Sequence, residues 1–210
     1  MCGRYTVLTE DEIIKIRQIL RDISLGLVRD EIGKNAVDEG GKKEVFPTNT
    51  APVITRDKLG VNFENIKWGF KKWQDGGVII NARAETLKEK VMFAKHLFTG
   101  RCVVPAGEFF EWERIGGKKK KYYAKDRGGN LLFMAGLYRN VRDNESVSGY
   151  SREFVIITKN SVTEINKIHS RMPVLLRVDQ IEPWLNGKMS PEELVSSYYE
   201  VEIAPCEDEK

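Results

Sequence analysis

The stretch Arg101-Cys-Val-Val-Pro-Ala-Gly-Glu-Phe-Phe-Glu-Trp112 holds two short apolar runs with turn residues between them. Arg101 to Pro105 and Phe109 to Trp112 each have the length and the β-branched or aromatic content of a strand. Similar runs, broken by turn residues, recur on both sides of this stretch: Pro52 to Thr55, Gly60 to Phe63, Ile66 to Phe70, Val78 to Asn81, Tyr122 to Ala124, Leu131 to Leu137, Phe154 to Thr158, Val174 to Arg177 and Val201 to Ile203. We therefore predict a fold built on many short strands.

Helical patterns are fewer and lie between these strands. Thr9-Glu-Asp-Glu12 is typical of a capping box, and apolar residues from Ile13 to Leu20 recur at helical spacing. Further helices are predicted at Thr86 to Phe98, Ser161 to Ile168, Gln180 to Leu185, and after Ser190 with Pro191 at the first helical position. Strands and helices without a regular βαβ rhythm indicate an α+β fold with a mostly antiparallel, barrel-like β core and peripheral helices.

The length of 210 residues suits a single domain with a substantial core, and no repeat or linker divides it. We expect residues 1–210 to form this single domain, with 21–44 as a surface insertion and 205–210 as an acidic tail. No apolar run reaches membrane-spanning length, and the start of the chain lacks a signal-peptide pattern. Three cysteines without paired spacing argue against a disulfide framework, so we expect a cytoplasmic protein.

The charged and metal-binding residue types set further limits. Two histidines, with no Cys-x-x-Cys and no His-x-x-x-His pair, argue against a metal site. The net charge of +3 permits a polyanionic partner without requiring one. The basic run from Lys118 to Lys121 is interpreted as a solvated loop.

The first five residues, Met1-Cys-Gly-Arg-Tyr5, place a thiol directly after the initiator methionine. Removal of Met1 leaves Cys2 with a thiol and a free α-amine, and the two groups together close a thiazolidine ring on an aldehyde. The reference pKa of the amine, about 7.7–8.0, leaves a useful fraction neutral, and the thiol needs a nearby base or cation to ionise. The alternative is that Cys2 is an accident of a disordered terminus.

Two internal segments place polar residues among apolar ones. Asn81 and Arg83 lie two residues apart, on the same side of a strand; the structural alternative is that Glu85 or Thr86 caps the helix that follows. Glu111, between two aromatic residues, is a candidate carboxyl with a raised pKa. Its alternative is a solvent-facing position on an edge strand.

Two more segments combine polar and aromatic residues. His169, in a loop beside Arg171, is the better acid–base candidate of the two histidines, whereas His96 in the middle of a predicted helix is interpreted as a structural or a surface residue. Residues 67–73 alternate aromatics with lysines, as stacking on unpaired bases requires. The same pattern also fits a strand with core aromatics and a basic outer face.

The order of these motifs is more specific than any one of them: Met-Cys-Gly-Arg-Tyr, Asn-x-Ala-Pro at 49–52, Trp-Gly at 68–69, Asn-Ala-Arg-Ala-Glu-Thr at 81–86, Pro-Ala-Gly-Glu-Phe-Phe-Glu-Trp at 105–112 and His-Ser-Arg-Met-Pro at 169–173. From Cys2 to about Trp184 the series closely resembles the SRAP (SOS-response-associated peptidase) family. The resemblance implies a protein that crosslinks to abasic sites in single-stranded DNA and loses Met1 by self-processing.

The resemblance also assigns roles to individual residues. Cys2 matches the crosslinking nucleophile, and the other active-site positions are Asn81, Glu111 and His169. The residues expected to contact DNA are Arg4, Asn49, Trp68, Arg83 and Arg171. Glu111 would shuttle protons, His169 would assist opening of the sugar ring and reversal, and Asn81 would orient Cys2. We expect no cofactor, no metal, no membrane, a monomer, and a place at the nucleoid when DNA is bound.

The chain departs from the family pattern at two places. Residues 46–52 read Phe-Pro-Thr-Asn-Thr-Ala-Pro, which keeps Asn49 but changes what precedes it, and Glu108 replaces a glycine common before the aromatics of the glutamate motif. Three other functions stay open at this point. These are an N-terminal-nucleophile peptidase or amidase, a non-catalytic reader of modified DNA, and an abasic-site lyase, which begins with the same imine as a crosslinker.

Overall fold

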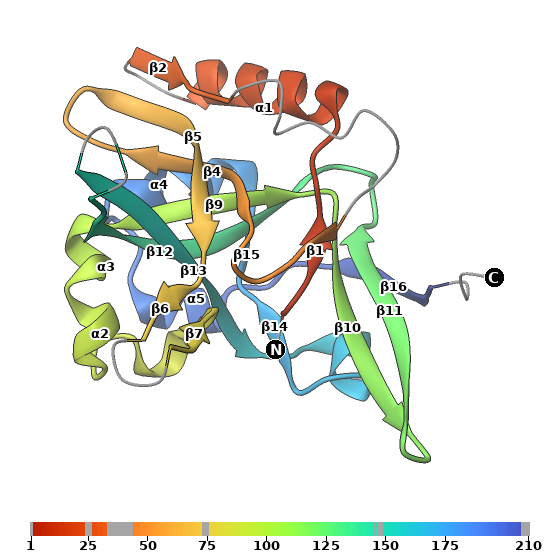
Figure 1. Ribbon diagram of the computed structural model, residues 1–210. Helices are drawn as coiled ribbons and strands as arrows, with labels where there is room; N and C mark the ends of the chain where they lie inside the picture. The colour runs from red at the N-terminus through yellow and green to blue at the C-terminus, as the bar shows by residue number, and fades with distance from the viewer. Residues whose placement is uncertain are drawn as a thin grey trace.

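The core of the molecule is a closed ring of five strands (Figure 1). The computed structural model describes residues 2–23, 27–32, 44–72, 76–144, 146 and 149–206. The ring runs β13–β12–β9–β4–β5 and closes because β13 also pairs with β5. All pairs in the ring are antiparallel except β13–β5. Its strands are β4 (Thr50–Arg56), β5 (Gly60–Trp68), β9 (Arg101–Ala106), β12 (Leu132–Arg142) and β13 (Tyr150–Asn160). The predicted α+β fold with a barrel-like, mostly antiparallel core is confirmed.

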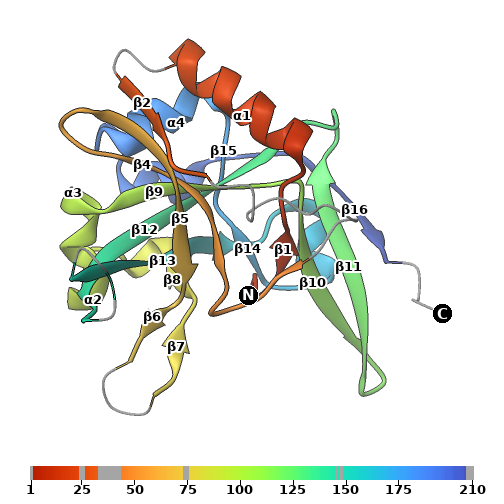
Figure 2. The ribbon, with the colours of Figure 1, turned by 45° about the horizontal axis from the view of Figure 1, so that its top comes forward.

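A smaller antiparallel sheet lies beside the barrel (Figures 1 and 2). Its strands, in the order β16–β11–β10–β1–β3, are β16 (Val201–Pro205), β11 (Lys118–Asp126), β10 (Glu108–Ile115), β1 (Tyr5–Thr6) and β3 (Glu44–Val45). The chain passes from β9 through Gly107 into β10, so residues 101–112 join the two sheets. The basic run 118–121 begins β11, and its interpretation as a loop is therefore wrong.

Short strands extend these sheets. β2 (Leu27–Asp30) pairs in parallel with β5, so part of the expected 21–44 surface insertion is a sheet strand, while 24–26 and 33–43 lie outside the described residues. β8 (Asn81–Arg83) pairs in parallel with β13, and β14 (Arg171–Pro173) pairs with its end. β15 (Leu175–Leu176) pairs with β12, whereas β6 (Phe70–Lys71) and β7 (Val78–Ile79) form a separate two-stranded sheet. Of the expected acidic tail, 207–210 lie outside the described residues.

The helices are peripheral, as predicted (Figure 1). They are α1 (Glu10–Ile23), α2 (Val91–Ala94), α3 (His96–Thr99), α4 (Val178–Leu185), α5 (Pro191–Ser196) and the 3₁₀ turns η2 (Ala84–Thr86) and η3 (Thr163–Lys167). The predicted capping box is present, because Thr9 N–H donates to Glu12 Oε2 at 2.8 Å and Glu12 N–H to Thr9 Oγ1 at 3.3 Å. The predicted helix 86–98 is wrong: it is a 3₁₀ turn followed by two four-residue helices. In the described part of the chain, no helix has the length and apolar character needed to cross a membrane.

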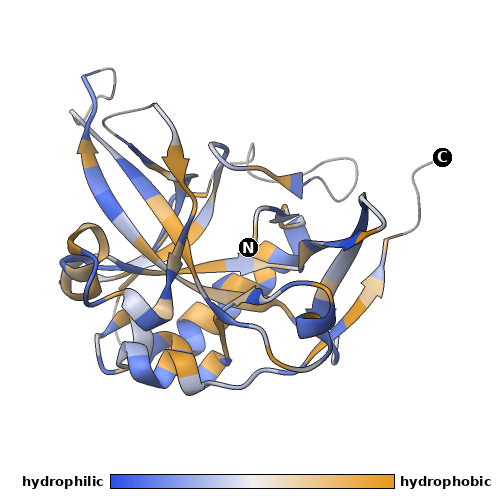
Figure 3. Cartoon of the chain, turned by 90° about the horizontal axis from the view of Figure 1, so that it is seen from below, coloured by the Kyte–Doolittle hydropathy of each residue, from blue (hydrophilic) through white to orange (hydrophobic). Residues whose placement is uncertain are grey.

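Alternate residues of the barrel strands enter two separate hydrophobic clusters. Hydrophobic stretches, orange in Figure 3, occur along both the strands and the helices. Val103 packs with the helices in one cluster, and its neighbour Val104 packs in the other with the start of the chain. The helices lie outside this ring (Figure 1), so the strand residues that pack with them face outward and the strand residues of the second cluster face into the barrel. The second cluster includes Cys2 and Tyr5, so the barrel core positions the first residues.

Candidate active site

Cys2 lies fully buried where the chain enters the small sheet, with 0% of its surface exposed. The side-chain amide of Asn81, at the start of β8, donates a hydrogen bond from Nδ2 to the Cys2 carbonyl oxygen at 2.9 Å. The thiol points to the Arg4 carbonyl oxygen at 3.8 Å. Burial, followed by the negative charge of Glu111, raises the pKa of the Cys2 thiol far above its usual range. The predicted contact between Asn81 and Cys2 is therefore present, but the thiol stays protonated at neutral pH.

Glu111 faces the same region from β10. Glu111 is only 3% exposed, and β10 lies between β11 and β1, so the alternative of a solvent-facing edge position does not hold. Burial raises the pKa of the Glu111 carboxyl to about 7, and the positive charge at the start of the chain opposes this rise. A carboxyl with a pKa near neutrality can both accept and return a proton.

His169 follows η3 and completes the group. The backbone N–H of Arg171 lies 3.0 Å from His169 Nδ1, and the Arg171 carbonyl oxygen lies 3.2 Å from the same nitrogen, so the backbone of Arg171 orients the ring. Burial lowers the pKa of His169, and the positive charge at the start of the chain lowers it further. That same charge acts on Cys2 and Glu111, so all three groups surround the first residues of the chain.

The two arginines predicted near the site differ in what they can bind. Arg83 is exposed and has no ion-pair or hydrogen-bond partner among the described side chains, so its guanidinium is accessible to a ligand. Arg171 is held instead: both of its terminal nitrogens bond to Glu85, at 2.7 and 2.9 Å, and Nη2 also donates to Thr158 O at 2.6 Å. Only 12% of the Arg171 side chain is exposed, so the protein itself already uses most of its donors, and the phosphate contact stays a prediction.

Arg4 is half-buried in an aromatic setting. Its guanidinium carbon lies 4.2 Å from the ring centroid of Phe46 and 4.9 Å from that of Trp112. Its Nη1 lies 2.9 Å from Glu44 Oε2, and the other oxygen of Glu44 bonds to Lys121. Part of the Arg4 guanidinium and the rings of Phe46 and Trp112 therefore lie beside the site.

Trp68 is 0% exposed, so its ring has no face open for the predicted stacking on a base in this structure. Its ring lies parallel to Phe154 at 6.2 Å, and its Nε1–H donates to the Ile80 carbonyl at 3.0 Å. The alternative, a strand with core aromatics and a basic outer face, is what the described part of 67–73 shows; Trp73 lies outside it. Asn49 closes a turn, accepting from Phe46 N–H at 2.9 Å.

Known proteins resemble this chain in sequence and in fold. The family model described as SOS response associated peptidase (SRAP) matches residues 1–208. The chain belongs to the SRAP family. The abasic site processing protein YoqW of Bacillus subtilis is 32% identical over 204 residues, which cover 94% of this chain and 85% of YoqW. The abasic site processing protein YedK of Escherichia coli is 24% identical over 197 residues, covering 92% and 83%. A solved structure of a Bacteroides thetaiotaomicron protein has the same fold, with a TM-score of 0.77 at 22% identity over 99% of this chain and 93% of that one.

Sequence reasoning missed three residues at the site of this SRAP protein. Glu85 was considered as a helix cap, but it pairs with Arg171 from a segment far along the chain. Glu44, the last residue of the expected insertion, and Phe46, just after it, both contact Arg4. The one available signal was the departure at 46–52, which sets an aromatic residue three positions before Asn49.

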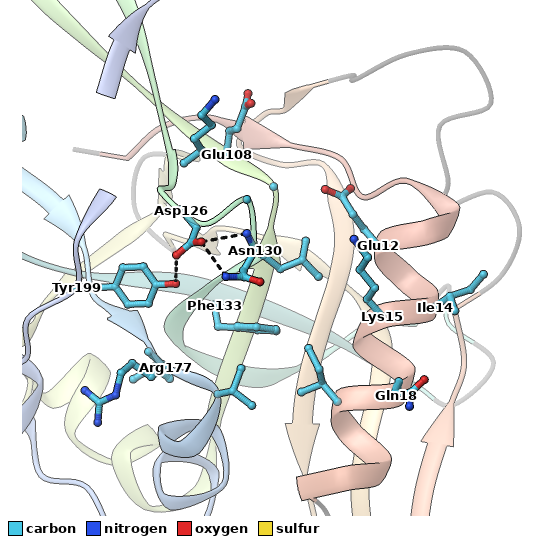
Figure 4. A pocket seen from close by; sticks show the side chains of 17 residues that line it. Glu12, Ile14, Lys15, Gln18, Glu108, Asp126, Asn130, Phe133, Arg177 and Tyr199 are labelled. Atoms are coloured by element: carbon cyan, nitrogen blue, oxygen red, sulfur yellow. Dashed lines mark hydrogen bonds between the residues drawn. The ribbon is translucent and has the colours of Figure 1, made fainter. Parts of the chain in front are cut away.

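A pocket of about 760 Å³ lies elsewhere, between α1 and the turn that joins β11 to β12 (Figure 4). None of the predicted site residues line it. Asp126 in this pocket accepts hydrogen bonds from Tyr199 Oη at 2.8 Å and Asn130 Nδ2 at 3.0 Å, which fix the pocket wall. Across the described residues, no cluster of three or more histidine, cysteine or acidic side chains could hold a metal ion.

Proposed function

We propose that this SRAP protein processes abasic sites in DNA by forming a covalent bond between Cys2 and the sugar of the lesion. YoqW and YedK, which match over most of their length, are named abasic site processing proteins. The observation that carries the proposal is the convergence of Asn81, Glu111 and His169 on the start of the chain, where Cys2 lies. A buried carboxyl with a pKa near 7 beside a thiol suits proton transfer during addition to an aldehyde.

The chemistry requires a free amine on Cys2 and an aldehyde on the DNA. Removal of Met1 supplies the amine, and ring opening of the abasic deoxyribose supplies the aldehyde at C1′. The amine nitrogen adds to C1′, the former carbonyl oxygen leaves as water, and an imine forms. The Cys2 sulfur then adds to the imine carbon, its proton passes to the nitrogen, and a thiazolidine closes. The product is protein plus DNA minus one water, with the protein still attached.

The pKa values decide the order of the two bonds. Because burial raises the pKa of the Cys2 thiol, the amine, with a reference pKa of about 8, reacts first. We assign to Glu111 the removal of protons from the amine and then the thiol, and their delivery to the leaving oxygen. His169 assists ring opening and the reverse reaction. Asn81 holds the Cys2 carbonyl and thereby the reacting nitrogen.

The DNA itself would be single-stranded and held mainly through its backbone. Arg83, which is exposed, would bind a flanking phosphate. Phe46, with 43% of its surface exposed beside Arg4, offers a base-stacking surface in place of the buried Trp68. We propose that the protein acts as a monomer in the cytoplasm and associates with the nucleoid when it binds DNA.

The test is intact-mass spectrometry before and after incubation with a single-stranded oligonucleotide that carries one abasic site. The wild-type protein should lack Met1 and gain the mass of the DNA minus one water. Cys2→Ala retains an amine but no thiol, so borohydride should trap its imine while no heat-stable adduct forms. Cys206→Ala, which removes a half-buried cysteine near the end of the described chain, is the matched control and should react like wild type. A heat-stable adduct with Cys2→Ala would overturn the assignment of the sulfur.

The family name also points to peptidase activity, which we propose is limited to the removal of Met1. Glu111→Gln keeps Cys2 after Met1, so an aminopeptidase would still remove that methionine. Retention of Met1 in the Glu111→Gln protein would therefore indicate self-processing. Lyase activity, which begins with the same imine, would instead yield cleaved DNA and free protein, and a non-catalytic reader would bind without any adduct.

A further inference from the structure

The hairpin of β10 and β11 extends away from the small sheet as a two-stranded arm (Figures 1 and 2). Its strands pair without interruption from Glu108↔Lys125 to Ile115↔Lys118. Gly116 and Gly117 close the arm with φ angles of 56° and 82°, the two positive values that a tight type I′ turn requires. Because the turn is so short, side chains at the tip hold fixed positions relative to Glu111, which lies on the same strand.

The two faces of this arm differ in charge. Directly paired residues point to the same side of a sheet, and successive residues alternate. Glu113 and Lys120, which pair, therefore share the face of Glu111 and have opposite charges. Arg114 and Lys119, which also pair, share the other face and are both positive.

The pairing of Arg114 with Lys119 does not stabilise the arm. Like charges directly opposite each other on paired strands destabilise a sheet. Both side chains are exposed, and neither has an ion-pair or hydrogen-bond partner in the part of the chain that the structure describes. Two fixed, uncompensated cations fit a site for an anionic ligand.

The same face leads back to the candidate active site. Trp112 and Lys121 lie on it, and the Arg4 guanidinium covers the Trp112 ring at 4.9 Å from the centroid. Glu44 is the only carboxylate in the described part of the chain that lies next to Arg4 and Lys121 on this face, and it bonds to both. From Glu111 to the tip the strand covers about 14 Å at about 3.4 Å per residue, which is the rise of about four nucleotides along a B-form strand.

We propose that Arg114 and Lys119 bind phosphates of the DNA strand that flanks the lesion, a few nucleotides from the sugar that Cys2 attacks. This inference rests on the proposed function, since its ligand is the strand held at Cys2. A nucleic acid fits better than an acidic protein segment, because its phosphates alternate with bases and this face alternates cations with the aromatic ring of Trp112.

The test compares two double variants that remove equal charge from the same arm. Arg114→Ala with Lys119→Ala removes the proposed contacts, and Lys118→Ala with Lys120→Ala is the matched control on the opposite face. Each protein is titrated against a fluorescent single-stranded oligonucleotide with one tetrahydrofuran abasic analogue, which has no aldehyde and cannot crosslink. The first variant should bind about tenfold more weakly at low salt, with a log–log salt slope shallower by about 1.4. The control should change less than twofold.

Several outcomes would overturn the inference. Equal losses in both variants would indicate a general effect of net charge, and no loss in either would remove the arm from the interface. Weaker binding of poly-glutamate with unchanged binding of DNA would assign the pair to an acidic protein partner. Removal of the like-charge pair should raise the midpoint of thermal unfolding slightly, so unfolding would not account for weaker binding.

The proposed function is tested separately, with true abasic DNA and wild-type protein. If wild type forms no adduct while analogue binding still depends on Arg114 and Lys119, the proposed function fails and the DNA contact stands. If the adduct forms but the two variants bind alike, only the contact fails.

Discussion

At the scale of single residues, Glu111 combines function with a cost in stability. Its carboxyl has a pKa of about 7 in the folded chain against about 4.5 when unfolded. Below pH 4.5 both states are protonated; between the two values only the unfolded state ionises, so stability falls as pH rises through this window and is then constant. At 1.36 kcal/mol per pKa unit, the loss reaches about 3 kcal/mol by pH 8.

The free energy of unfolding of Glu111→Gln should therefore exceed that of wild type by up to about 3 kcal/mol at pH 8. The difference should be smaller at pH 5. The measurement is urea unfolding of both proteins at the two pH values. Glu113→Gln, on the same face of the same strand, is the control and should show no pH-dependent gain. If the Glu111→Gln gain were equal at both pH values, burial of an ionised Glu111 would not be its cause.

Cys2 and Trp68 show what a linear motif can and cannot predict about a site. Asn81, Glu111 and His169 were found from residue type and local pattern, and their approach to Cys2 follows from strand pairing that brings distant segments together. Trp68 was misplaced because alternation along a strand does not say which face is buried. Here the even-numbered residues of β5 point into the barrel, where Trp68 meets Phe154.

At the scale of elements, the turn at 46–49 stores strain next to the site. Thr48 has a φ of 76°, a conformation that β-branched residues rarely adopt and that costs about 1–3 kcal/mol. The turn is held to the end of β5, because Thr48 N–H donates to Trp68 O and Trp68 N–H to Asn49 O, both at 2.8 Å. The turn therefore positions the Phe46 ring against the Arg4 guanidinium.

Thr48→Asn should relieve this strain, because asparagine tolerates positive φ, and should raise the free energy of unfolding by about 1 kcal/mol. Thr48→Val keeps the branched Cβ and is the control that should bring no such gain. The measurement is chemical denaturation of the three proteins. Equal stability of the asparagine and valine variants would show that the turn is not strained at this position.

Elements with strong local signals were predicted well, and those set by tertiary pairing were not. The capping box of α1 and the Ser190-Pro191 start of α5 hold because caps are local interactions. The lysine run 118–121 was expected to be a loop, because a run of four like charges does not indicate which strand it pairs with. Its pairing with β10 makes it a strand. The helix expected at 86–98 breaks at Lys90, whose extended backbone separates the two turns.

At the scale of the whole molecule, the two hydrophobic clusters share the same strands. Ile156 packs inside the barrel while Ile157 packs under the helices, and Val104 and Val103 divide in the same way. Loss of one cluster removes the packing of strands that form the other. The single domain predicted from the length and the absence of a linker should therefore unfold in one cooperative step.

Trp68 in the inner cluster and Trp184 in the helix-side cluster allow a test, because each is fully buried. In one variant Trp68 is the only tryptophan, and in the other it is Trp184, with phenylalanine at the remaining positions. Within each variant, urea unfolding followed by tryptophan fluorescence should have the same midpoint as unfolding followed by far-ultraviolet circular dichroism. A fluorescence midpoint for Trp184 well below that of circular dichroism would mean that the helices detach before the barrel opens. The barrel and the site at Cys2 would then be the more stable unit, and the lesion-binding face could persist without the helices.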